Sequence, residues 1–260
     1  MEYLFKSMDI IKSESDVKHP LILLKYFFPQ KTKEKYDLFK KICNLDINFQ
    51  LKEINQKIKN TIDNFLKIGY GVINFTLKTR TRLIVGFGSA STLETSVLLD
   101  RVLGIPYIPG SSLKGCFRDY VKNYINDGDE IKNNFRLIFG SEDEITEEDN
   151  YENYDNIKGN IFFYNAYPSE NQNKVFEIDV MNVHYQDYYS GKDKIPNECK
   201  NPVPINFLCV RPEIKFNFYL LLNKKIIGLK TKIENYFINM LEEHGVGAKT
   251  NIDYGYFKKI

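Results

Sequence analysis

The spacing of the apolar residues changes at residues 69–71, and this change constrains the fold more than any other feature. Between residues 31 and 67 apolar side chains recur every three or four positions, as on one face of a helix, with charged residues mainly on the other face. Residues 70–87 are instead rich in β-branched, aromatic and aliphatic side chains, which is typical of a strand. We therefore expect a helical N-terminal lobe over about residues 1–68, followed by a region that contains a sheet.

Helical and strand-like segments follow one another along the rest of the chain. We expect helices at residues 113–125, 130–139 and 230–243, and further strands at residues 159–167, 174–183, 205–210, 215–223 and 254–258. This order suits an α+β domain with one antiparallel sheet and helices on one face. The chain has 260 residues, no internal repeat and no flexible linker, so we treat residues 1–260 as a single domain.

The composition excludes several classes of function. Basic and acidic residues nearly balance, 36 against 34, so binding of nucleic acid requires positive charge that is focused on one face. Residues 141–155 hold eight acids and no Lys or Arg, and we expect a solvated loop there that does not face nucleic acid. The histidines and cysteines lack the spacing of metal ligands or of a redox pair, so we expect no metal and no cofactor. No apolar run suits a membrane span and the first residues lack a secretory signal, so we expect a cytoplasmic protein.

A short basic segment lies in the predicted strand 70–87. Because successive side chains of a strand alternate between its faces, Lys78, Arg80 and Arg82 would point to the same side. Three unpaired cations about 6.6 Å apart repel one another unless anions lie between them, and the phosphates of a single nucleic-acid strand have comparable spacing. The alternative is a solvated edge strand whose cations prevent pairing with another sheet.

A second candidate phosphate site lies at the start of the first helix predicted after that strand. A Pro-Gly turn places Ser111 and Ser112 at the N-cap, where free backbone N–H groups and the helix dipole attract anions. Lys114, Arg118 and Lys122 then follow at intervals of four residues, along one ridge of the helix. We favour a phosphate site over the alternative, which is a capped helix with a polar stripe.

A glycine-rich segment near the C-terminal end has the sequence Gly-Val-Gly-Ala-Lys-Thr at residues 245–250 and looks like a nucleotide P-loop. It lacks two glycines that the P-loop pattern requires, and it follows a helix where a P-loop follows a strand, so we exclude an NTPase. Gly245, Gly247 and Lys249 can still pass close to a backbone and bind phosphate through N–H groups. A flexible turn is the equal alternative.

No group of residues has the pattern of an active site. A ribonuclease needs an acid and a base, or a metal held by carboxylates. His19, His184 and His244 are isolated, and no pattern joins them to Asp100 or Glu94. We therefore expect no catalytic residues.

Taken together, these segments resemble a known family. Residues 104–115, which read Gly-Ile-Pro-Tyr-Ile-Pro-Gly-Ser-Ser-Leu-Lys-Gly, are similar to the signature of the RAMP superfamily of CRISPR RNA-binding proteins. Residues 245–250 with 254–257 are similar to the glycine-rich loop of that superfamily, although the glycines are less dense here. Residues 179–189 and 201–210 resemble the family of sixth subunits of the Cmr (type III-B) interference complexes.

The resemblance implies an RRM-like (ferredoxin-like) antiparallel sheet with inserted lobes. It also implies a non-catalytic subunit for antiviral defence, which binds the guide RNA (crRNA) backbone near its 3′ end, caps the filament of backbone subunits and contacts other RAMP and small-subunit proteins. Because guide sequences vary, the contacts must fall on phosphate and sugar. The residues expected to make them are Lys78, Arg80, Arg82, Ser111, Ser112, Lys114, Arg118, Gly245, Gly247 and Lys249.

Two alternatives stay open. One is an endoribonuclease of the same superfamily that processes guide precursors, with His184 or His19 as the acid or base. The other is a protein-docking module that makes no contact with RNA.

Overall fold

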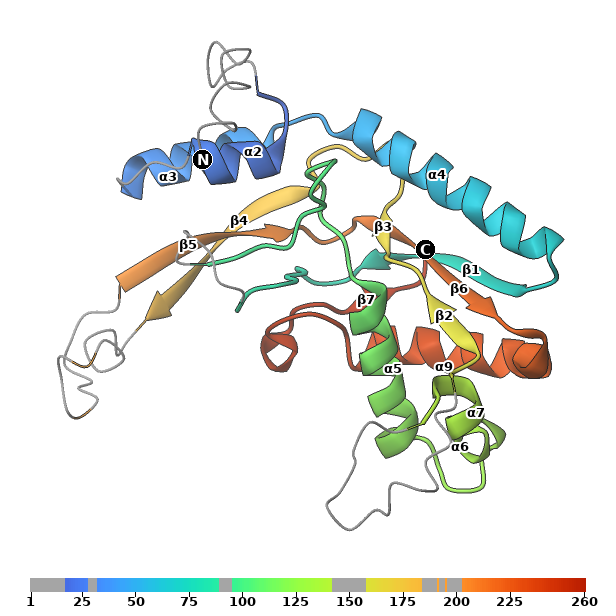
Figure 1. The fold of residues 1–260 in the computed structure, drawn as a ribbon. Helices are drawn as coiled ribbons and strands as arrows, with labels where there is room; N and C mark the ends of the chain where they lie inside the picture. The colour runs from blue at the N-terminus through green and yellow to red at the C-terminus, as the bar shows by residue number, and fades with distance from the viewer. Residues whose placement is uncertain are drawn as a thin grey trace.

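A central antiparallel sheet organises the chain (Figure 1). The structure is a computed structural model that describes residues 17–27, 32–88, 95–141, 158–183, 191, 195 and 203–260. The strands of the sheet are, in spatial order, β2 (Ile161–Phe163), β6 (Lys215–Leu222), β1 (Gly71–Thr79) and β7 (Phe257–Lys258), and β3 (Tyr167–Pro168) also pairs with β6. All of these pairings are antiparallel.

The topology of this sheet is ferredoxin-like. The helix α5 (Gly110–Tyr124) follows β1, and α9 (Lys230–Glu243) follows β6, while β2 and β3 share the second strand position. The chain order is therefore strand, helix, strand, strand, helix, strand, and in space the fourth strand position lies beside the first, then the third, then the second. This confirms the α+β, RRM-like fold, and α9 spans the residues predicted for it.

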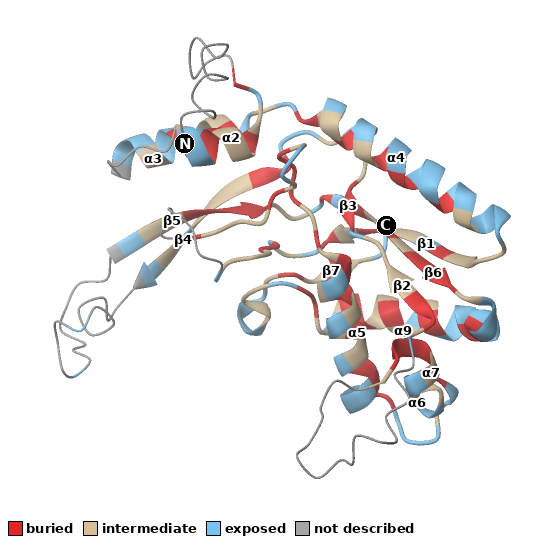
Figure 2. Cartoon of the chain, in the orientation of Figure 1, coloured by how far each residue is buried: buried red, intermediate tan, exposed pale blue. Residues whose placement is uncertain are grey.

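The core lies mainly between the sheet and the helices α5 and α9, which share one face (Figures 1 and 2). Phe75 of β1 stacks on Phe218 of β6 with ring centroids 5.4 Å apart, and it meets Phe237 of α9 at 5.8 Å. Phe117 of α5 contacts the same Phe237 ring at 5.3 Å. Burial of each such side chain stabilises the fold by roughly 1.5–3 kcal/mol. This packing fixes the position of α5 and the serines at its start.

Among the described residues, three helices precede β1, all within the predicted helical lobe: α2 (Pro20–Tyr26), α3 (Thr32–Cys43) and α4 (Asn48–Lys67). The helix α4 covers the other face of the sheet and turns its buried residues toward it (Figure 2). The amide of Asn217 on β6 donates to the Oδ1 atom of Asn55 at 2.8 Å, and the Asn55 amide donates to the carbonyl of Pro168 at 2.9 Å. Of the helices in the described ranges, none is both long enough and apolar enough to cross a membrane.

A second, two-stranded sheet corrects the expectation of a single sheet. Strands β4 (Phe176–Val183) and β5 (Val203–Val210) pair with each other and extend away from the main sheet (Figure 1). We call them the β4–β5 ribbon, which is inserted between the second and third strand positions. A β-bridge between Leu83 and Val210 connects the ribbon to the chain that follows β1. His184 and residues 142–157, most of the acidic segment, lie outside the described residues.

Several other predicted elements have different bounds. The strand predicted at residues 70–87 ends at Thr79, and the last strand begins at Phe257. The helix predicted at residues 130–139 is interrupted at Asn134, whose side-chain amide and backbone N–H both donate to the carbonyl of Glu130, at 2.8 and 3.1 Å. The two resulting helices are α6 (Glu130–Asn133) and α7 (Phe135–Phe139).

Candidate nucleic-acid interface

The segment that follows β1 runs along the glycine-rich loop, which we define as residues 245–256. The N–H of Arg80 donates to the carbonyl of Tyr256 at 2.7 Å, at the position that follows the β1–β7 pairing. The N–H of Gly255 in turn donates to the carbonyl of Arg82 at 2.7 Å. Two of the three segments singled out in the sequence are thus in direct contact.

Two of the three cations in that segment have carboxylate partners. The Nζ atom of Lys78 lies 2.7 Å from the carboxylate of Glu213. The guanidinium of Arg82 forms ion pairs with Glu177 and, at 3.3 Å, with Asp179. The expectation of three unpaired cations on one strand face is therefore wrong, because the strand ends before the second cation and carboxylates from distant strands and turns neutralise the other two.

Arg80 differs from the other two cations of this segment in its partner, which is an aromatic ring. Its guanidinium lies 5.0 Å from the centre of the Tyr256 ring, and no carboxylate of the described residues forms an ion pair with it. The Tyr256 hydroxyl donates to the carbonyl of Thr250 at 3.2 Å, which fixes the ring within the glycine-rich loop. A guanidinium that stacks on a ring keeps the donors at its edge available, and these donors match the oxygens of a phosphate.

The glycines of the loop are required by its own backbone. Gly247 has φ of 96°, and a Cβ atom there would overlap the carbonyl oxygen of Ile84. Gly245 has φ of 68°, and its Cβ atom would lie 2.9 Å from the carbonyl oxygen of Gly255. Both conformations lie in the left-handed region that favours glycine. The glycines therefore allow the loop to pack against the segment after β1, whatever else they contact.

Lys249 turns its charge toward the protein. Its Nζ atom lies 4.8 Å from the ring centre of Phe87, 5.2 Å from that of Phe207 and 3.7 Å from the sulfur of Met181. The residue also has φ of 63°, which is uncommon for a side chain other than glycine. These contacts join the glycine-rich loop to the base of the β4–β5 ribbon.

The helix α5 begins three residues earlier than predicted, so the serines lie in its first turn. The N-cap is Pro109, and the N–H of Gly110 is satisfied by the Oδ1 atom of Asn165 at 2.9 Å. The backbone N–H groups of Ser111 and Ser112 have no acceptor outside the helix among the described residues. Two free donors thus remain at the positive end of the helix dipole.

The basic residues of α5 lie on a different flank from the glycine-rich loop. At about 100° per residue, Lys114 and Arg118 are opposite Cys116. Arg118 lies 5.7 Å from the ring centre of Phe135 in α7, whereas Cys116 lines a cavity beside the glycine-rich loop. Gly115 lies between the two flanks, and a Cβ atom there would meet nothing within 4 Å. The surface of α5 between the two flanks is therefore bare at this glycine.

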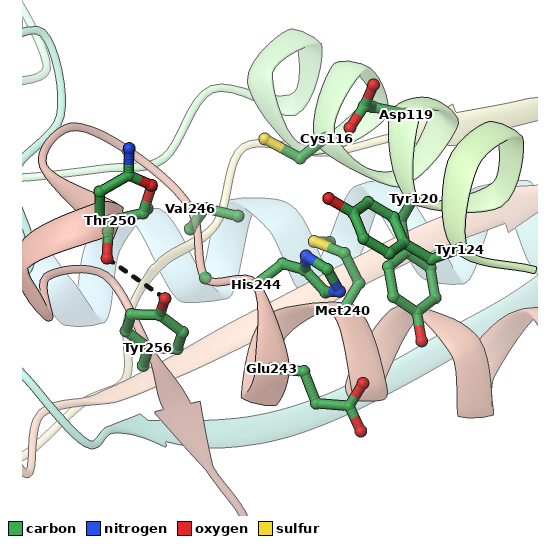
Figure 3. Close-up of a pocket in the computed structure, with 13 residues that line it drawn as sticks. Cys116, Asp119, Tyr120, Tyr124, Met240, Glu243, His244, Val246, Thr250 and Tyr256 are labelled. Carbon is green, nitrogen blue, oxygen red and sulfur yellow. Dashed lines mark hydrogen bonds between the residues drawn. The ribbon is translucent and has the colours of Figure 1, made fainter.

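The cavity separates α5 from the end of α9 and the glycine-rich loop (Figure 3), and its volume is about 310 Å³. Tyr120 and Tyr124 line it from α5, His244 from the residue after α9, and Tyr256 from the loop. Burial, together with the nearby carboxylate of Glu243, raises the pKa of the Tyr120 hydroxyl. Sequence analysis did not single out this cavity, because its walls come from three separate segments.

Two of the residues weighed for catalysis, His19 and Asp100, hold neighbouring segments together. His19 caps α2, since its Nδ1 atom accepts from the N–H of Ile22 at 3.3 Å and its Nε2 atom lies 3.0 Å from the carbonyl of Val102. Asp100 accepts from the N–H of Val102 and from the hydroxyl of Tyr167, whose pKa burial raises to about 12. Within the described ranges, no three His, Cys, Asp or Glu residues are grouped so as to hold a metal ion.

Comparisons with known proteins identify relatives. The chain is 26% identical over 267 residues to the CRISPR system CMR subunit Cmr6 of Saccharolobus solfataricus, covering 99% of this chain and 84% of that protein. It is 31% identical over 223 residues to the Cmr6 subunit of Pyrococcus furiosus, covering 68% of this chain and 65% of that protein. A chain in a cryo-EM structure of the type III-B Cmr-beta bound to cognate target RNA has a TM-score of 0.64 at 18% identity, covering 98% of this chain and 84% of that one.

The family match covers the sheet and the site together. Residues 76–258 match the RAMP superfamily. This range takes in the end of β1, all of α5 and α9, the β4–β5 ribbon and the glycine-rich loop. The chain therefore belongs to the RAMP superfamily.

Proposed function

We propose that this chain is a Cmr6-type subunit of a type III-B CRISPR complex, which binds the sugar–phosphate backbone of the guide RNA and does not cleave it. The observation that carries the proposal is the exposed guanidinium of Arg80, mounted on Tyr256 beside the glycine-rich loop of a RAMP fold. Guide sequences vary, so the contacts that all guides share must fall on phosphates and riboses rather than on base edges.

The phosphate contacts are made from two places on the surface. Arg80 supplies the first, and the free N–H groups and hydroxyls of Ser111 and Ser112 supply the second, with Lys114 and Arg118 continuing along α5. RNA passes between them over Gly115, where no side chain intervenes.

The other predicted contact residues act mainly by positioning this surface. The charges of Lys78 and Arg82 are neutralised by carboxylates, and that of Lys249 faces aromatic rings. Gly245 and Gly247 allow the loop to approach the segment that carries Arg80.

The names of the relatives support membership of a Cmr complex. The curated relatives bear the name of a Cmr subunit, and we propose that this chain likewise caps the filament of backbone subunits near the 3′ end of the guide. Its partners are then the guide RNA, other RAMP subunits and the small subunits, in the cytoplasm.

The test is salt-dependent binding of single-stranded RNA to the full chain. Arg80→Ala should weaken binding to all sequences alike and reduce the slope of log affinity against log salt by about 0.7. Arg101→Ala removes the same charge from an exposed turn beside α2 and should leave the slope unchanged. Equal slopes for the wild type and Arg80→Ala would remove Arg80 from the interface, and a wild-type affinity that does not respond to salt would favour the docking module.

A cleavage assay tests the non-catalytic part of the proposal. Purified chain incubated with precursor guide RNA, with and without divalent metal, should leave the RNA intact. Discrete cleavage that is lost in His184→Ala would instead establish the endoribonuclease.

A further inference from the structure

We propose that the cavity between α5, α9 and the glycine-rich loop binds one unstacked guanine base of the RNA, while the phosphate of that nucleotide stays outside on Arg80. This inference rests on the proposed function and adds a base contact to it. It concerns a subsite that the phosphate contacts alone do not require.

The first argument is the shape and the aromatic lining of the cavity. Its volume of about 310 Å³ is at the lower end of the range for small-ligand pockets, which suits a single base. Tyr124 lies at the mouth of the cavity and is 59% exposed. The centroid of the Tyr124 ring lies 4.1 Å from that of the His244 ring. Tyr120 stacks on Tyr124 from within, with centroids 5.8 Å apart. Figure 3 shows these three rings on one side of the cavity and Tyr256 on the other. Planar rings on two sides are the lining that an unstacked base requires.

The second argument is the position of Arg80. Its guanidinium stacks on Tyr256, and Tyr256 lines the cavity. If the base of a nucleotide lies beside the Tyr256 ring, the phosphate of that nucleotide is therefore close to the Arg80 guanidinium. The exposed backbone at Gly247 lies at the same wall and offers no side chain to block the sugar.

The third argument is the charge of the walls, which selects both the orientation and the base. Asp119 and Glu243 line the cavity, and carboxylates accept hydrogen bonds but do not donate them. Their negative charge excludes a phosphate from the cavity, so the neutral base must enter and the phosphate must remain outside.

Glu243 supplies the carboxylate that can accept hydrogen bonds from the base. One oxygen of Asp119 already accepts from the side-chain amide of Asn123 at 2.8 Å. Glu243 has neither a hydrogen bond nor an ion pair with any described residue. Guanine presents two adjacent donors on its Watson–Crick edge, N1–H and N2–H, which match the two oxygens of one carboxylate. Uracil presents a single N–H between two carbonyl oxygens that a carboxylate repels, so guanine should bind best and uracil worst.

The experiment measures binding of the full chain to three RNA probes of equal length. They are a uridine oligonucleotide, the same oligonucleotide with one central guanosine, and a ribose–phosphate strand without bases. The wild type should bind the guanosine probe about fivefold or more tightly than the uridine probe, the lower end of what a bidentate contact to a base gives. It should bind the strand without bases least tightly.

Two variants test whether the preference for guanosine arises in this cavity. Glu243→Gln keeps the size of an exposed side chain that has no described partner, so the fold is retained, and the ratio of guanosine to uridine affinity should fall to within about twofold because the bidentate match is lost. Tyr124→Ala should weaken binding of both base-containing probes and leave the strand without bases unaffected. The matched control is Tyr26→Ala, which removes a tyrosine that is 50% exposed on α2.

The outcomes separate this inference from the proposed function. If the wild type binds all three probes equally, the base subsite is wrong and the phosphate contacts stand. If the guanosine preference survives in Glu243→Gln, the assignment to this cavity is also wrong. If no probe binds, the proposed function itself is overturned.

Discussion

The guanidinium of Arg80 lies 5.0 Å from the centre of the Tyr256 ring, although 176 positions separate the two residues in the 260-residue chain. The contact depends on the backbone pairing between the segment after β1 and the glycine-rich loop, where the Arg80 N–H donates to the Tyr256 carbonyl. Tyr256 thus contacts Arg80 through both its backbone carbonyl and its ring.

Removal of the Tyr256 ring should weaken the binding of RNA by Arg80. We expect Tyr256→Ala to lower RNA affinity about as much as Arg80→Ala, and the double variant to lower it little further, because the two residues act as a unit. Tyr256→Phe keeps the ring and loses only the hydrogen bond to Thr250, so it should retain most of the affinity. Filter binding across a salt series measures all four proteins, and additive effects in the double variant would contradict the coupling.

Removal of the Arg82 side chain should loosen the β4–β5 ribbon. Glu177 and Asp179 would lose their shared cation and repel each other, and the Asp179 side chain is only 16% exposed. We expect Arg82→Ala to lower the free energy of unfolding by about 1–2 kcal/mol, between the values for exposed and buried ion pairs. Urea denaturation measures the loss, and hydrogen exchange should increase first in β4 and β5. Unchanged exchange in the ribbon would mean that the ion pair does not hold it.

Acid should weaken the attachment of β1 to its neighbours. Hydrogen bonds from Lys258 and Lys78 lower the pKa of Glu213 below its ordinary value of 4.5. Folding therefore favours the charged carboxylate, and this stabilisation is present above pH 4.5 and is lost as the pH falls through the lowered folded value. Thermal melting at neutral pH and near pH 3 should show a smaller decrease in Tm for Glu213→Gln than for the wild type. An identical decrease in both proteins would show that the pair does not contribute.

Gly115→Ala should separate stability from RNA binding. The residue is inside α5 and its missing Cβ faces open space, so alanine should stabilise the helix by about 0.5–1 kcal/mol. If RNA crosses α5 there, the added methyl group meets it, and we expect affinity to decrease while Tm increases. An increase in Tm without loss of affinity would place the RNA elsewhere.

Gly247→Ala should act in the opposite way on stability. The residue has φ of 96°, and a Cβ atom would overlap the carbonyl oxygen of Ile84. The left-handed backbone alone costs about 1–2 kcal/mol for a residue with a Cβ atom, and the overlap adds to that cost. We expect a lower Tm than in the wild type, with weaker RNA binding because the support of Arg80 is displaced. A variant as stable as the wild type would mean that the loop can rearrange freely.

Local patterns in the sequence predicted most of the secondary structure. The apolar residues Ile233, Phe237 and Met240 recur at helical spacing, and α9 has its predicted bounds because nothing in its interior breaks that spacing. The prediction of one helix at residues 130–139 was wrong, since the structure has two short helices that meet at Asn134. The prediction of a strand after residue 79 was wrong, because the segment there pairs with the glycine-rich loop near the other end of the chain.

The candidate site was harder to predict, because its ion pairs join distant residues. The Arg82 and Glu177 side chains are 95 positions apart, and no local pattern connects them. One signal was present: Glu177 and Asp179 alternate in the strand predicted at residues 174–183, which places two carboxylates on one face. Such a pair requires cations from elsewhere, and Arg82 supplies one.

The attachment of the β4–β5 ribbon has a mechanical consequence. Arg82 binds the ribbon through its side chain, the bridge at Leu83 binds it through the backbone, and Arg80 precedes both on the same short segment. Any displacement of the ribbon is therefore transmitted along three covalently linked residues to the guanidinium. Under the proposed function, a neighbouring protein that binds the ribbon would therefore alter the contact between Arg80 and RNA, without a separate hinge.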